Sequence, residues 1–123
     1  MENPVAAAPN LPFDRAKALR NLEDSEDLLR EIADIFVSDY RGELAAMRAA
    51  IAVGDASTLF RLAHTMKSSM ASFCAQAAFD ATVVLVKQAR EGRLTGIDER
   101  LTEVERLADE LAKALRAEIA AGG

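Results

Sequence analysis

Tryptophan is absent from this chain of 123 residues, and aromatic residues make up only 5% of it. Half of the residues are nevertheless hydrophobic, so the core must consist largely of alanine, leucine and other aliphatic side chains. Such a composition favours packed helices over sheets, which draw on β-branched and aromatic residues. The length suits one domain of ordinary size, and we therefore expect a single domain.

Cysteine is nearly absent as well, because Cys74 is the only one in the sequence. A single thiol excludes an internal disulfide and any metal cluster held by several cysteines. We interpret Cys74 as a small, buried apolar residue. We predict neither a metal site nor a cofactor on this chain.

Basic residues are in the minority, with 15 lysines and arginines against 20 acids, and the net charge is −5. This balance argues against nucleic acid or an anionic membrane as a partner. No window approaches the roughly 20 apolar residues that span a bilayer, and the N-terminus lacks the features of a signal peptide. We therefore expect a soluble, cytoplasmic protein.

Helical periodicity begins at Phe13, after a proline-rich start that we interpret as a flexible segment at residues 1–12. The domain is expected over residues 13–121. Turn and capping residues divide it into five predicted helices, with Asp24 or Ser25 as the cap of the second, Gly54 as its stop and Asp55 as the cap of the third. The first four cover about 13–22, 25–51, 55–74 and 76–90, and the fifth follows a capping box at Thr95 and Asp98 and reaches Ile119.

The second and fifth predicted helices each carry one apolar stripe, with steps of three or four residues. The stripes consist of Leu29, Ile32, Phe36, Tyr40, Leu44, Met47 and Ile51, and of Ile97, Leu101, Val104, Leu107, Leu111, Leu115 and Ile119. Short loops favour antiparallel neighbours. The sequence thus predicts an all-α fold, an up-down antiparallel four-helix bundle with a short additional N-terminal helix. Because such a bundle closes on itself and its surface is acidic, we expect a monomer.

The third predicted helix contains the only histidine, His64. When each residue is turned by about 100°, His64 points about 150° away from the middle of the apolar cluster on this helix. The spacing places Phe60, Lys67 and Ser68 on the same face. A phenylalanine on a solvent-facing stripe indicates a surface that meets a partner, although Phe60 could also reach sideways into a groove between helices.

The residues of this face suit phosphoryl chemistry. Neutral imidazole attacks acyl phosphates and forms a phosphoramidate that can pass the group on. Lys67 offers a positive charge to the phosphoryl oxygens, and Ser68 offers a small hydrogen-bond donor. Taken singly, each residue has a plainer interpretation as an ordinary surface side chain. Together they indicate a phosphoacceptor site.

The segment LAHTMKSS at residues 62–69 resembles the phosphoacceptor helix of histidine-containing phosphotransfer (HPt) domains, whose pattern is roughly L-A-H-x-L-K-G-S/A. The resemblance covers about residues 13–120 and implies a phosphorelay carrier in two-component signal transduction. It makes His64 the phosphoacceptor, with Lys67 and Ser68 stabilising the phosphoryl group. It also implies a docking patch for response-regulator receiver domains, formed by Phe60, Arg61 and Ala71.

The same resemblance implies that aspartyl phosphates on receiver domains, some within hybrid sensor histidine kinases, are the donors and acceptors. Mg²⁺ would then lie on the receiver and not on this chain. The sequence departs from the family pattern at Ser68, where glycine is most common, and at Ala71 and Cys74, where glycine or another very small residue is frequent. Serine is still small, so we expect activity to survive.

Other functions fit the sequence less well. It contains no glycine-rich phosphate loop, so we expect no kinase activity and no ATP site. It also lacks the Glu-x-x-His pairs of a di-iron bundle and the nucleophile elbow of a serine hydrolase. The remaining alternative is a helical adaptor or inhibitor that binds a histidine kinase or a receiver sterically. The retention of both His64 and Lys67 argues against it, because steric inhibition needs neither.

Overall fold

The computed structural model describes residues 11–122, so the predicted flexible segment lies outside the described residues except at its last two positions. The described part contains five helices and no strand, which confirms the all-α prediction. They are α1 (Arg15–Asn21), α2 (Glu26–Ala52), α3 (Ala56–Ser72), α4 (Gln76–Arg90) and α5 (Ile97–Gly122). Within residues 11–122, no helix combines the length and the apolar character needed to cross a membrane.

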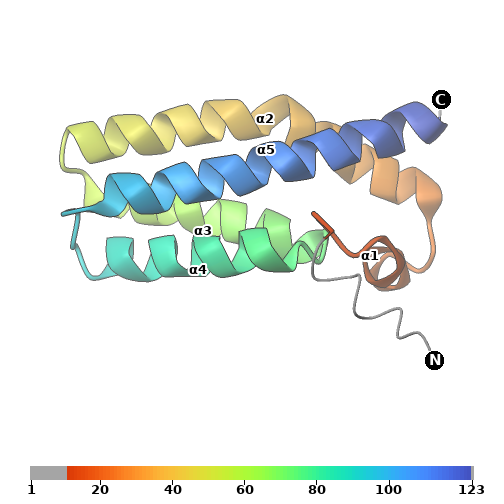
Figure 1. Ribbon diagram of the computed structural model, residues 1–123, viewed down its shortest axis with the longest axis horizontal. Coiled ribbons are helices and arrows are strands. Elements are labelled where there is room, and N and C mark those ends of the chain that lie inside the picture. Colours follow the sequence, from red (N-terminus) through yellow and green to blue (C-terminus); the bar gives the residue numbers. More distant parts are fainter. Residues whose placement is uncertain (1–10, 123) are drawn as a thin grey trace.

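The four long helices lie side by side, and consecutive ones run in opposite directions (Figure 1). Helix α2 packs against α3 and α5, and α4 packs against the same two helices. Helix α1 is short and contacts α2. The backbone nitrogen of Asp14 donates to the carbonyl oxygen of Cys74 at 3.2 Å, which ties the start of α1 to the turn after α3.

The capping residues of the sequence set the starts of α2 and α3. The side chains of Ser25 and Asp55 are the N-caps, and each accepts a hydrogen bond from the backbone nitrogen three residues later. Gly54 follows the C-terminal end of α2 with a φ of +74°, a conformation that glycine adopts without a steric penalty. The predicted boundary between the second and third helices is therefore confirmed.

The start of α5 differs from the prediction. Helix α5 begins at Ile97, and Gly96 immediately before it has a φ of +75°. A capping box requires an extended residue directly before the first turn, with its side chain bonded to the backbone. The predicted capping box at Thr95 and Asp98 is therefore wrong. The side-chain amide of Gln88 stabilises the loop instead, by donating to two loop carbonyl oxygens at 2.9 and 3.1 Å.

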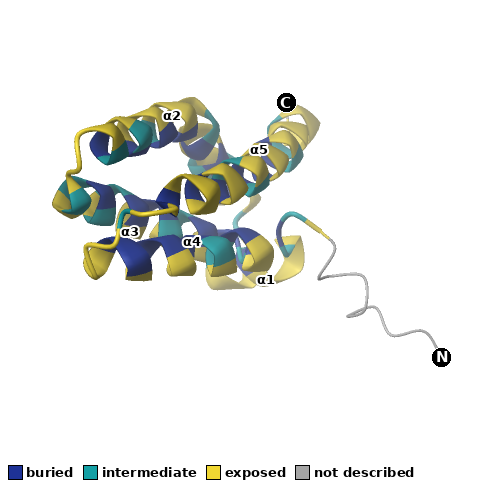
Figure 2. Ribbon diagram, turned by 60° about the vertical axis from the view of Figure 1, so that its left-hand side comes forward, coloured by how far each residue is buried: buried dark blue, intermediate teal, exposed yellow. Residues whose placement is uncertain are grey.

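The core lies where the four long helices face one another (Figure 2). Most of the two predicted stripes is buried, while four residues at their edges are half-buried: Ile32, Ile51, Leu107 and Ile119. Phe36 stacks on Tyr40 with 5.2 Å between ring centroids, and Phe73 of the α3–α4 turn meets Phe36 edge-on at 5.8 Å. These contacts hold α2 against the end of α3. They therefore fix the position of the exposed face of α3.

Cys74 is half-buried and packs against the hydrophobic core, so the prediction of a small, buried apolar residue is only partly correct. It lies in the turn after α3 with a φ of +53°, and its sulfur accepts a hydrogen bond from the Asn21 amide at 3.6 Å. Residues with a β-carbon seldom adopt a positive φ. Glycine is the usual residue at such a helix end, which agrees with the family's frequent use of glycine or another very small residue where this chain has Cys74.

Candidate functional site

Helix α3 has one buried face and one exposed face. The buried face consists of Leu59, Ala63, Met66 and Met70, all with no exposed surface. His64 is exposed on the other side, as its helical position predicts. Within residues 11–122, neither ring nitrogen of His64 forms a hydrogen bond. A nitrogen lone pair is therefore open to an incoming electrophile, on a helix whose opposite side is held by the core.

Phe60 lies one turn before His64, and the two ring centroids are 5.8 Å apart at an interplanar angle of 39°. The phenyl ring is half-buried and also packs against the hydrophobic core. Both interpretations of Phe60 are thus partly correct. It reaches inward between the helices, and its remaining surface lies beside the imidazole.

Lys67 lies about one turn after His64 and is half-buried. No carboxylate in the described part of the chain forms an ion pair with its ammonium group. A lysine without a local partner keeps its charge available for an anion that arrives from outside. The pair of His64 and Lys67 therefore combines a nucleophile with a free cation.

Ser68 is exposed, and its hydroxyl donates to the carbonyl oxygen of His64 at 3.3 Å. Three other hydroxyls on α3 donate in the same way to the carbonyl four residues earlier, those of Thr65, Ser69 and Ser72. Such bonds to the carbonyl four residues earlier are a common arrangement of serine and threonine inside helices. In this rotamer the Ser68 hydrogen is directed at the backbone, and a rotation about χ1 would release it.

Arg61 and Ala71 are exposed on the same helix, before and after His64. The guanidinium of Arg61 donates to the Thr58 hydroxyl at 3.2 Å, and this hydroxyl donates to the Asp55 carboxylate at 2.6 Å. Hydrogen bonds from the Thr58 side chain and backbone lower the pKa of Asp55 below its usual value. Arg61 is thereby linked to the N-cap of α3.

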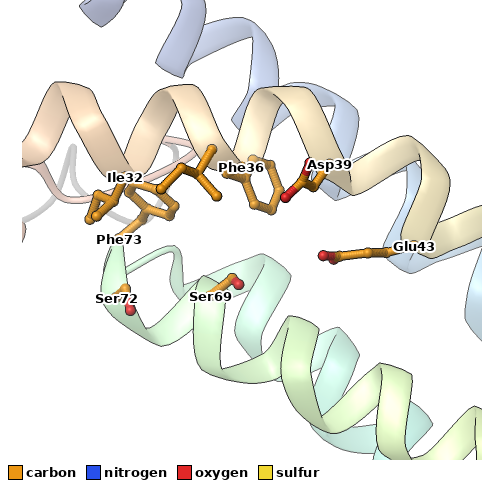
Figure 3. Close-up of a pocket in the computed structure, with 8 residues that line it drawn as sticks. Ile32, Phe36, Asp39, Glu43, Ser69, Ser72 and Phe73 are labelled. Atoms are coloured by element: carbon orange, nitrogen blue, oxygen red, sulfur yellow. The ribbon is translucent and has the colours of Figure 1, made fainter.

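A groove between α2 and α3 lies outside the predicted site. Asp39 and Glu43 of α2 point into it, and Ser69 and Ser72 of α3 lie on its opposite wall (Figure 3). Burial, and secondarily the Asp39 carboxylate, raise the pKa of Glu43. The spacing of the two acids, four residues apart on one helix, is the sequence signal that could have indicated them.

The described residues contain no group of three or more histidine, cysteine, aspartate or glutamate side chains that could hold a metal ion.

Comparisons with known proteins give two findings. The family model described as "Hpt domain" matches residues 31–117. Among solved structures, the chain is similar to histidine-containing phosphotransfer protein B (HptB) from Pseudomonas aeruginosa PAO1. The TM-score is 0.80 and the sequence identity 25%, and the match covers 88% of this chain and 94% of the other. No curated protein matches the sequence.

Proposed function

The chain belongs to the histidine-containing phosphotransfer (HPt) domain family and is a phosphorelay carrier, and we propose that His64 is its phosphoacceptor. One observation carries this assignment: His64 is exposed, with both ring nitrogens free of hydrogen bonds within residues 11–122, beside a lysine that has no ion-pair partner there. A nucleophile that must meet the phosphoryl group of another protein needs this exposure.

In the proposed reaction, a lone pair of the imidazole attacks the phosphorus of an aspartyl phosphate on a receiver domain. The new N–P bond forms while the P–O bond to the aspartate breaks, and the carboxylate leaves with the electron pair. Attack by the aspartate of a second receiver reverses these steps and returns His64 to neutral imidazole. The carrier therefore needs no ATP site, and we propose that it has no kinase activity of its own.

Lys67 and Ser68 are proposed to stabilise the transferred group. The transferred phosphoryl carries about two negative charges, and a free ammonium one turn away offsets them. The Ser68 hydroxyl would leave the His64 carbonyl and donate to a phosphoryl oxygen. The 3.3 Å length of its present bond supports this exchange, because little interaction energy is lost.

The proposed docking patch for receiver domains surrounds His64 and consists of Phe60, Arg61 and Ala71. The half-buried ring of Phe60 supports this role, because it offers apolar surface on a rigid base. Response-regulator receivers, free or within a hybrid sensor histidine kinase, would be the partners. The Mg²⁺ needed for transfer would lie on the receiver, with no metal on this chain.

Two further properties belong to this proposal. We take the fold as an up-down antiparallel four-helix bundle with α1 as a short additional helix, in line with the ring of contacts among the four long helices. We propose that the protein acts as a monomer in the cytoplasm, where receivers would approach the exposed face of α3.

The test is phosphate loading by the purified protein from a phosphorylated receiver of its host. We expect one phosphate that is labile in acid and stable in alkali, and no loading of His64→Gln. The lability separates phosphohistidine from phosphoserine, which matters because Ser68 and Ser69 lie close by. Equal loading of His64→Gln, with circular dichroism matching the wild type, would contradict the assignment. A wild type that binds receivers but never loads would favour the steric adaptor or inhibitor.

A further inference from the structure

The groove between α2 and α3 has a volume of about 220 Å³ and combines apolar and acidic walls. Its apolar part includes Ile32 and Ile35, and the Ile35 side chain is 56% exposed. Its acidic part consists of Asp39 and Glu43, whose carboxylates extend from α2 into the space between the helices (Figure 3). The groove therefore joins an apolar wall to an acidic one.

The two carboxylates of the groove lack cationic partners. Within residues 11–122, neither Asp39 nor Glu43 forms an ion pair or a side-chain hydrogen bond, and no basic residue lines the groove. Like charges four residues apart on a helix repel each other. Burial makes the negative charge of Glu43 costlier still, and the pKa of Glu43 is raised. A cation placed between the two acids would relieve both effects.

The groove borders the face that carries His64, because Ser72, which lines the groove, lies about 80° round α3 from His64 at 100° per residue. The Ser72 hydroxyl donates to the Ser68 carbonyl at 3.1 Å, and the Ser68 hydroxyl donates to the His64 carbonyl at 3.3 Å. His64, Ser68 and Ser72 are therefore spaced about one turn apart along α3. Ser72, the last of them, lines the groove. Ser72 lies about 12 Å from His64 along the helix axis, at 1.5 Å per residue.

The size of a protein interface makes this distance significant. A standard interface buries about 800 Å² on each partner, which corresponds to a disc roughly 16 Å in radius. A receiver centred on His64 would therefore reach the α3 wall of the groove, across from Asp39 and Glu43 of α2.

We propose that the α2–α3 groove binds a lysine or arginine side chain of the docked receiver between Asp39 and Glu43, with the aliphatic stem of that side chain against Ile32 and Ile35. The proposal rests on the phosphorelay function. Long basic side chains suit such a groove, because their stems cover apolar surface while their charged ends meet the carboxylates. Charge complementarity of this kind governs association and the choice of partner more than the chemical step.

The test uses Asp39→Asn/Glu43→Gln, which removes both charges and preserves the shape of the side chains. The matched control is Glu31→Gln/Asp34→Asn, which removes the same charge from exposed positions of α2 outside the groove. The probe is the phosphorylated host receiver that loads the wild type fastest. Loading rates are measured against receiver concentration at low and at high salt.

We expect the groove variant to need roughly three to ten times more receiver for half-maximal loading, with the rate at saturation unchanged. Its dependence on salt should be weaker than that of the wild type, while the control behaves like the wild type. Ile35→Ser, at an exposed position, should weaken docking without weakening the salt dependence.

Three results would overturn the groove proposal. In the first, the groove variant loads with the affinity and salt dependence of the wild type. Only the groove proposal then fails, because phosphate on His64 would still support the carrier function. In the second, the wild type is a dimer that the groove variant dissociates with no change in receiver affinity, which would place a second copy of the chain in the groove. In the third, the wild type loads from no receiver, and the phosphorelay function fails as well.

Discussion

The two faces of α3 differ in how completely their side chains are engaged. On the buried face, Met66 and Met70 are enclosed by the core and have no exposed surface. On the exposed face, His64 has no side-chain hydrogen bond and Lys67 no ion pair within residues 11–122. The buried face thus fixes the helix, while the exposed face retains free hydrogen-bonding and charged groups. Stability and phosphotransfer should therefore respond to different substitutions on the same helix.

Met66→Ala should have the largest effect on stability, although Met66 is only two residues from His64. Truncation of a fully buried methionine removes apolar contacts and leaves a cavity, at a cost of about 2–5 kcal/mol. Urea unfolding measures this loss, and loading of His64 is assayed where the variant remains folded. Met66→Leu is the control and should cost less than about 1.5 kcal/mol. A folded Met66→Ala protein that no longer loads would show that the two faces are not independent.

Lys67→Ala should have the opposite effects to Met66→Ala, with a large loss of transfer rate and little loss of stability. A charge-assisted hydrogen bond contributes about 1.5–3 kcal/mol, so its loss from the transition state should slow transfer roughly tenfold or more. Stability should change by less than about 0.5 kcal/mol, because the ammonium has no ion pair in the described part of the chain. Rapid-quench transfer kinetics and urea unfolding test the two expectations, with Lys113→Ala at an exposed position of α5 as the control. Unfolding of Lys67→Ala would show that this lysine is structural.

The difference between the faces also explains which features could be predicted from the sequence. Local rules were sufficient for the cap at Asp55 and for the outward direction of His64, and they left only Asp24 and Ser25 for the cap of α2, because each depends on neighbours within one or two turns. Gly54 likewise marks the end of α2 through its own conformational freedom.

Features that depend on contacts between helices were missed or only partly predicted. The half-buried state of Phe60 follows from how α3 sits against its neighbours, which periodicity alone does not determine. The groove beside Asp39 and Glu43 requires the register of α2 on α3. The capping box predicted before α5 was wrong, because Gly96 with its positive φ precedes the helix and the Gln88 amide of α4 bonds the loop carbonyls.

Ser68 should show the smallest effects. Its exposed hydroxyl is bonded to the helix backbone at the His64 carbonyl, so its loss should affect both stability and transfer. Ser68→Ala removes that bond and introduces the best helix former, so stability should rise by about 0.5 kcal/mol. If the hydroxyl also holds the phosphoryl group, transfer should slow about two- to threefold and the phosphorylated state should have a shorter half-life.

Ser68→Gly provides the matched comparison, because it removes the same hydroxyl but lowers helix propensity, and stability should fall by about 0.5 kcal/mol relative to wild type. Both variants should have the same transfer defect if the hydroxyl is responsible, despite opposite changes in stability. Transfer at the wild-type rate in both variants would exclude a role for the hydroxyl. A small residue would then be sufficient at this position, and stabilisation of the phosphoryl group would be left to Lys67.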